Sequence, residues 1–156
     1  MSAPRADPRA VRWVRFAADC VEHVICLSDS ARPQVEAAIR AARAWADDPT
    51  EERREAAADA AEAAEEVAFG ETLHHPIRDV AYSAVCAAYA AYFAEAAYAA
   101  DAAHYAAYAS DAATLRAHRF VLRIGGLSAL PAVGERDWQL GRLRRYGLQY
   151  SDEVLA

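Results

Sequence analysis

The sequence has 156 residues, of which 55% are hydrophobic, and its formal net charge is −6 at pH 7. This length fits a single domain with one core, and the abundance of alanine, the best helix former, favours an all-α fold. The negative charge argues against nucleic acid as the main partner, because phosphate binding requires clustered positive charge.

The first helix is predicted to begin at Asp7-Pro8 and to end near Leu27–Asp29. Aspartate is a favourable N-cap, and proline suits the first helical position. Apolar side chains recur at steps of three and four and form one inward stripe of Trp13, Phe16, Ala17, Cys20, Val24 and Leu27. Asp19 and His23 stand at i and i+4, so we expect a surface pair rather than an oriented general base.

The second helix is predicted to begin at Arg32-Pro33 and to end near Ala46. Arg40 and Arg43 are expected at the edge of its apolar stripe or outside it. The residues expected to face inward are Val35, Ile39, Ala42 and either Trp45 or Ala46.

The third helix is predicted to begin at Asp48-Pro49, where Asp48 and Glu51 have the spacing of a capping box. It is expected to end near Phe69, with Gly70 at the C′ position. Its inner face is expected to consist almost entirely of alanine, with Ala56, Ala60, Ala63, Ala64 and Val67.

The charge along the chain is uneven. Residues 47–66 hold nine acidic groups against Arg53 and Arg54, whereas residues 116–145 hold seven arginines. One interpretation is two solvated faces that keep the protein in solution. The other is an acidic docking face for a basic partner, made by Glu51, Glu55, Asp59, Glu62 and Glu66.

The next unit opens at His74-His75-Pro76, where the histidines are expected to have a cap or loop role. Residues 77–124 contain no Gly or Pro. A straight helix of that length would measure about 70 Å, too long for a compact domain of this size. We therefore predict a central hairpin with at least one break, at Ser110-Asp111 or as a kink around Glu95–Asp101. Its charged residues argue against a membrane span.

Aromatic residues are regular in this hairpin. Tyr82, Tyr89 and Phe93 share a face with Cys86, which favours packing in the core. The alternative is a small-molecule pocket between the central helices, lined by Tyr89, Tyr92, Tyr98, Asp101, His104 and Tyr105. Asp101 and His104 form only half of a di-metal bundle motif, so we predict no metal site and no cofactor.

The last helix is predicted over about Glu135–Tyr146, with Leu140, Leu143 and Tyr146 facing inward. Trp138 is expected to point away from that stripe, toward the preceding loop, a neighbouring helix or solvent. The tail after Gly147 is expected to be loosely held.

No catalytic residues are predicted. The phosphate-cradle, dinucleotide, zinc and serine-nucleophile motifs are missing from the sequence. The cysteines Cys20, Cys26 and Cys86 lie in apolar patterns without a CxxC pair, so we expect buried thiols rather than nucleophiles. Free cysteines and an N-terminus without an apolar signal stretch predict a cytoplasmic protein.

Two segments carry a family resemblance. They are Trp13–Val24, which contains Ala-Asp-Cys-Val-Glu-His-Val, and residues 32–46, which run from Arg-Pro to Ala-Trp-Ala. Together with Glu135, Arg136, Trp138, Gln139 and Leu143 near the C-terminus, they resemble a family of small, all-helical bacterial immunity proteins from polymorphic toxin systems, relatives of the fifth immunity family. The middle of the chain matches mainly in being rich in alanine.

The resemblance implies a protein that binds a cognate toxin domain and neutralises it without catalysis. Toxin domains that attack nucleic acid are often basic, so the acidic helix is the expected binding face. Two alternatives stay open: the tyrosine-lined ligand pocket, in a binding protein or small enzyme, and a homodimer formed through exposed aromatic residues. In each case we expect one all-helical domain over residues 1–156, a compact bundle of about six helices with its ordered core at about 7–147.

Overall fold

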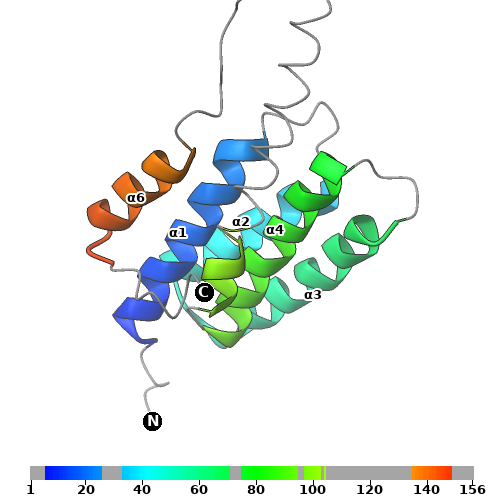
Figure 1. Ribbon diagram of the computed structural model, residues 1–156. Coiled ribbons are helices and arrows are strands. Elements are labelled where there is room, and N and C mark those ends of the chain that lie inside the picture. Colours follow the sequence, from blue (N-terminus) through cyan, green and yellow to red (C-terminus); the bar gives the residue numbers. More distant parts are fainter. Residues whose placement is uncertain are drawn as a thin grey trace, which may run out of the picture.

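Alanine-rich amphipathic segments fold into helices that pack side by side (Figure 1). A computed structural model of the chain describes residues 6–25, 33–70, 75–94, 97–102, 104 and 135–148, and none of these residues lies in a β-strand. The bounded helices are α1 (Pro8–Ile25), α2 (Pro33–Asp47), α3 (Glu51–Ala68), α4 (His75–Phe93) and α6 (Glu135–Arg145). With the helical segment 97–102, they confirm the predicted all-α bundle.

Helix α4 is the centre of the bundle. It packs against α1, α2 and α3, and α6 lies beside α1 at the edge (Figure 1). The α4 segment 80–91 is buried almost all round, mostly through alanine, so neighbouring backbones approach closely. None of the helices in the described ranges combines the length and hydropathy needed to cross a bilayer. The return arm of the predicted hairpin, beyond residue 104, lies outside these ranges.

The predicted starts and inner faces of α1 and α2 are confirmed. The backbone N–H of Arg9 donates to Asp7 Oδ1 at 2.8 Å, so Asp7 is the N-cap. The predicted stripe of α1 is buried up to Val24, while Leu27 and the expected helix end fall outside the described residues. In α2 all the predicted inward residues are buried, Arg40 is exposed, and Arg43 stands at the edge of the stripe.

The predicted capping box of α3 is wrong. Thr50 is the N-cap, because its Oγ1 accepts a hydrogen bond from the backbone N–H of Arg53 at 3.3 Å. The helix begins at Glu51, so Asp48 stands two residues before the cap. Its carbonyl oxygen instead accepts from the Thr50 N–H at 2.9 Å, and its carboxylate lies 3.4 Å from Arg53 Nη2.

The inner face of α3 is rotated by about one residue from the predicted one. Its buried residues are Ala57, Ala61, Ala64 and Ala68. Ala56 is exposed, and Ala60, Ala63 and Val67 are only partly buried. Alanine occurs all around this helix, so no bulky side chain marks the inner face in the sequence. The predicted end is confirmed, with Phe69 as C-cap and Gly70 after it.

The predicted break in the alanine-rich stretch is confirmed. Helix α4 ends at Phe93, and Ala94 adopts the left-handed region with φ 51°. Helical structure is present again from residue 97. Helix α4 therefore ends just before the predicted kink region Glu95–Asp101. The alternative break at Ser110-Asp111 lies outside the described residues.

Helix α6 ends in a Schellman motif. Gly147 has φ 63°, its N–H donates to the Arg144 carbonyl at 3.0 Å, and the Leu148 N–H donates to the Leu143 carbonyl at 2.9 Å. Leu148 is buried beside the core, so at this position the expectation of a loose tail is wrong. Residues after 148 lie outside the described ranges.

The inward face of α6 also differs from the predicted stripe. Leu143 is buried and Tyr146 is partly buried, as expected, but Leu140 is 37% exposed and Gln139 is buried in its place. The rotation follows from the polar and aromatic contacts that α6 makes with α1. These contacts turn the face of Trp138 and Arg142 toward that helix.

Candidate functional site

The predicted partner-binding residues lie together on one exposed face of α3, which we call the acidic face: Glu51, Glu55, Asp59, Glu62 and Glu66. They recur at steps of three and four, so their side chains lie along one side of the helix. The opposite side carries the buried alanines and packs against α2 and α4. The predicted exposure of this face is confirmed.

Among the described residues, cations compensate the acidic face only at its N-terminal end. There Arg54 forms an ion pair with Glu51, which raises the pKa of Arg54 through their hydrogen bond. In the part of the chain that the structure describes, Glu55, Asp59, Glu62 and Glu66 form no ion pair. The last turn of α3 has no basic residue, although cations are the favoured charges at a helix C-terminus.

Aromatic side chains flank the C-terminal end of the acidic face. Phe69 is 64% exposed, and its ring contacts the edge of Tyr82 with centroids 5.7 Å apart. The Tyr89 hydroxyl donates to Glu65 Oε2 at 3.3 Å, and burial together with the Glu65 charge raises the pKa of Tyr89. Phe69 stands three residues after Glu66, so its exposed ring continues the acidic face at its C-terminal end.

The tyrosines proposed as pocket lining pack against one another. The Phe93 ring stacks on the Tyr98 ring, with centroids 5.1 Å apart, and its centroid lies 4.7 Å from that of Tyr92. The ring centroids of Tyr89 and Tyr98 are 5.8 Å apart. These side chains therefore form an aromatic cluster at the end of α4. Two further predicted pocket residues, Asp101 and His104, are exposed, and Tyr105 lies outside the described residues.

The described part of the chain brings no three His, Cys, Asp or Glu side chains together as ligands for one metal ion. Cys20 and Cys86 are free thiols in the core, as predicted, while Cys26 lies outside the described residues. Burial raises the pKa of Cys86 to about 12, so its thiol stays protonated at neutral pH and is a poor nucleophile.

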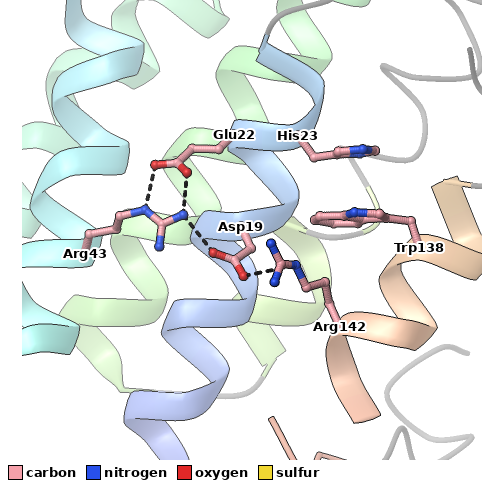
Figure 2. A pocket seen from close by; sticks show the side chains of 6 residues that line it. All are labelled: Asp19, Glu22, His23, Arg43, Trp138 and Arg142. Carbon is pink, nitrogen blue, oxygen red and sulfur yellow. Dashed lines mark hydrogen bonds and ion pairs between the residues drawn. The ribbon is translucent and has the colours of Figure 1, made fainter. Parts of the chain in front are cut away.

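A pocket that the sequence analysis does not predict lies between α1, α2 and α6 (Figure 2). Its volume is about 270 Å³, and it is lined by Asp19, Glu22 and His23 of α1, Arg43 of α2, and Trp138 and Arg142 of α6. The His23 and Trp138 rings stack with their centroids 3.9 Å apart and an angle of 7° between their planes. Arg142 lies 5.3 Å from the Trp138 ring centroid. Trp138 thus contacts a neighbouring helix, one of its predicted alternatives.

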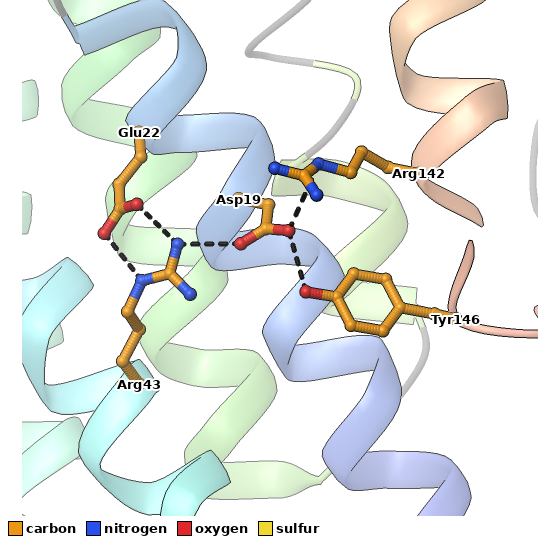
Figure 3. A network of polar contacts seen from close by, with 5 residues as sticks. All are labelled: Asp19, Glu22, Arg43, Arg142 and Tyr146. Atoms are coloured by element: carbon orange, nitrogen blue, oxygen red, sulfur yellow. Dashed lines mark hydrogen bonds and ion pairs between the residues drawn. The ribbon is translucent and has the colours of Figure 1, made fainter. Parts of the chain in front are cut away.

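Asp19, one of the lining residues, is the centre of an ion-pair network (Figure 3). Arg43 Nη2 donates to Asp19 Oδ1 at 2.7 Å, and the Tyr146 hydroxyl donates to Asp19 Oδ2 at 2.8 Å. Arg142 Nε lies 3.5 Å from the same Oδ2. Both Asp19 oxygens are therefore engaged by groups from other helices or from the chain after α6.

Arg43 binds two carboxylates at once. Its Nε donates to Glu22 Oε1 at 2.6 Å, and its Nη2 donates to Glu22 Oε2 at 2.5 Å. These hydrogen bonds to Glu22, together with the one to Asp19, raise the pKa of Arg43 despite its partial burial. Because Asp19 is buried in this network, the interpretation of Asp19 and His23 as a surface pair is wrong.

The sequence does contain one signal for this site. Asp19 is the only charged residue in the stretch 16–21, whose residues are all buried in α1. A carboxylate in such a run requires a cation or several donors, because an unpaired buried charge is very costly. Nothing in the sequence marks Arg43, Arg142 and Tyr146 as the partners of Asp19, since their proximity depends on how α2 and α6 pack against α1.

No protein-family model, curated protein or solved structure matches the chain.

Proposed function

We propose that this chain is an immunity-type protein that binds a basic toxin domain through the acidic face of α3 and neutralises it without catalysis. The observation that carries the proposal is the run of carboxylates from Glu55 to Glu66, which form no ion pair among the described residues. Its residues are neighbours at i,i+3 and i,i+4, where like charges destabilise a helix by about 0.2–0.5 kcal/mol per pair.

Such a row lowers the stability of the free protein, and a basic partner would offset that loss on binding. Positive groups on the partner would also be steered toward the face, which raises the association rate. The exposed Phe69 ring at the end of the row supplies an apolar anchor beside the charges. The resemblance of residues 13–46 to immunity proteins supports the same role.

The test uses the protein encoded by the adjacent gene as the partner. The variant Asp59→Arg/Glu62→Arg reverses two carboxylates at the middle of the face. The matched control, Glu36→Arg/Asp101→Arg, reverses two exposed carboxylates on other helices. Each double variant changes the formal charge by +4, so a general charge effect would appear in both.

We expect calorimetry to give a dissociation constant that rises at least about tenfold for the α3 variant and less than about threefold for the control. Added salt should weaken wild-type binding more than binding of the α3 variant, because fewer charges remain to be screened. Equal losses in the two variants, or no complex with the neighbouring gene product, would count against the proposal.

A further inference from the structure

The pocket between α1, α2 and α6 has an excess of unused hydrogen-bond donors. A guanidinium carries five N–H donors, and Arg142 uses none of them in a hydrogen bond within the described residues. Its Nε is buried without a hydrogen-bond acceptor and makes only the longer ion pair to Asp19 at 3.5 Å. Figure 2 shows this guanidinium beside Asp19 and Trp138, on the lining of the pocket.

The carboxylate acceptors in the same pocket are already engaged. Both oxygens of Glu22 accept from Arg43, and the two oxygens of Asp19 accept from Arg43 and Tyr146. A ligand that only donates hydrogen bonds would have to compete with these short contacts. A ligand that accepts them would bind the terminal N–H groups of Arg142, whose side chain is 31% exposed and lines the pocket, whereas its Nε is closed to solvent.

The unused donors of Arg142, and not the net charge of the pocket, favour an anion. The formal charges of Asp19 and Glu22 are balanced by those of Arg43 and Arg142. Arg43 binds both oxygens of Glu22 and one oxygen of Asp19, so fewer of its donors remain than on Arg142. The planar guanidinium fork matches the two oxygens of a carboxylate or phosphate group.

We infer that this pocket is a binding site for a small oxyanion, a carboxylate or a phosphate group, held by the Arg142 fork against Trp138. The volume of about 270 Å³ lies just below the 300–1,000 Å³ typical of pockets for larger ligands, which fits a small molecule. The site is independent of the acidic face of α3. Because the pocket has walls on α1, α2 and α6, its occupant would also tie α6 to the bundle.

The experiment follows the indole N–H signals of the three tryptophans by nuclear magnetic resonance. A Trp138→Phe variant assigns the Trp138 signal. The wild-type protein is titrated with sodium acetate, with sodium phosphate and with sodium chloride at matched ionic strength. Saturable movement of the Trp138 signal with acetate alone assigns a carboxylate site, with phosphate alone a phosphate site, and with both a general oxyanion site.

Movement no larger than that caused by chloride would overturn the inference. Arg142→Gln should weaken binding at least about tenfold, while Arg144→Gln, an exposed neighbour on the same helix, should leave it unchanged. Arg142→Lys retains the charge that pairs with Asp19 but loses the paired donors of the guanidinium. It therefore tests the site even if Arg142→Gln loosens the packing of α6. Wild-type affinity in the lysine variant would also overturn the inference, because the fork would then have no role.

Discussion

The hydroxyl of Tyr146 donates a hydrogen bond to Asp19, a residue 127 positions earlier in the chain. Together with the ion pair from Arg142, this bond attaches the C-terminal end of the described chain to the first helix. These polar bonds, the stacking of His23 on Trp138 and the burial of Leu143 together hold α6 beside α1.

Replacing Asp19 by asparagine should lower the free energy of unfolding by about 3 kcal/mol. Loss of one member of a buried ion pair typically costs about 3–5 kcal/mol, and the lower value applies because Arg43 and Arg142 are each about a third exposed. Urea unfolding measures the change. Asp47→Asn, which removes an exposed pair with Arg15, is the control and should change stability by less than about 1 kcal/mol. Equal effects would contradict a central role for Asp19.

Stability should fall at alkaline pH in part through Tyr146. Burial, and next the hydrogen bond to Asp19, raise the pKa of Tyr146 above its ordinary value of 10.0. The folded state thus holds the proton more tightly than the unfolded chain. This contribution is fully present below pH 10.0 and is lost as the pH rises through the folded pKa.

Urea unfolding at pH 8 and pH 11 compares the wild type with Tyr146→Phe. The wild type should lose more stability between the two pH values than the variant, which lacks the titrating hydroxyl. An identical loss would show that Tyr146 titrates alike in the folded and unfolded chains.

Enlarging an alanine at the α3 interface should destabilise the bundle. Ala61 is fully buried, so Ala61→Leu forces the neighbouring helices apart and should cost about 1–3 kcal/mol. In a chain of this size each 1 kcal/mol corresponds to a shift of about 2–4 °C in Tm. Ala56→Leu, on the exposed side of the same helix, is the control and should leave Tm nearly unchanged. A larger loss of Tm in Ala56→Leu than in Ala61→Leu would instead support the inner face predicted from the sequence.

Cys86 should resist alkylation in the native protein. A pKa of about 12, compared with 9.0 for an ordinary thiol, lowers its thiolate fraction at pH 8 by about a thousandfold, and burial blocks the reagent as well. Iodoacetamide labelling in a Cys26→Ser background, followed by mass spectrometry, reports on Cys20 and Cys86. Both thiols should label in guanidinium but not in buffer. Rapid native labelling of Cys86 would contradict its burial.

Neutralising carboxylates at the two ends of α3 should change the stability of the protein in opposite directions. Glu62→Gln/Glu66→Gln removes a like-charge i,i+4 pair near the negative end of the helix dipole and should raise stability by about 0.5–1 kcal/mol. Glu51→Gln/Glu52→Gln, in the first turn, removes favourable charges and should lower it slightly. Thermal unfolding measures both. If the first variant is destabilised, the acidic face stabilises the free protein and the main support for the proposed function is lost.

The sequence predicts those parts of the fold that depend on local chemistry. The start of α1 follows from Asp7-Pro8, and the inner faces of α1 and α2 follow from bulky residues such as Trp13 and Ile39 at helical spacing. The inner face of α3 is off by one residue because alanine differs too little between buried and exposed positions. A break is expected from the length of the stretch alone, and the observed one at Ala94 lies beside one of the two predicted positions.

The two candidate sites differ in how far they can be predicted. The acidic face is local, because five carboxylates at helical spacing share a side of any helix they form. The pocket is not local, since it combines residues of α1 and α2 with Trp138 and Arg142 of α6. Asp19 indicates that a cation must lie nearby, but the sequence contains 17 arginines and does not specify which ones.

The alanine-lined interface of α3 also affects the entropy that would be lost when a partner binds. Ala57, Ala61, Ala64 and Ala68 have no rotatable side chain to rearrange, and they seat α3 directly on α2 and α4. A protein that binds to the outer side of this helix would contact a rigid surface that is already in place. Little backbone entropy would then be lost on association, so more of the electrostatic attraction would remain as affinity.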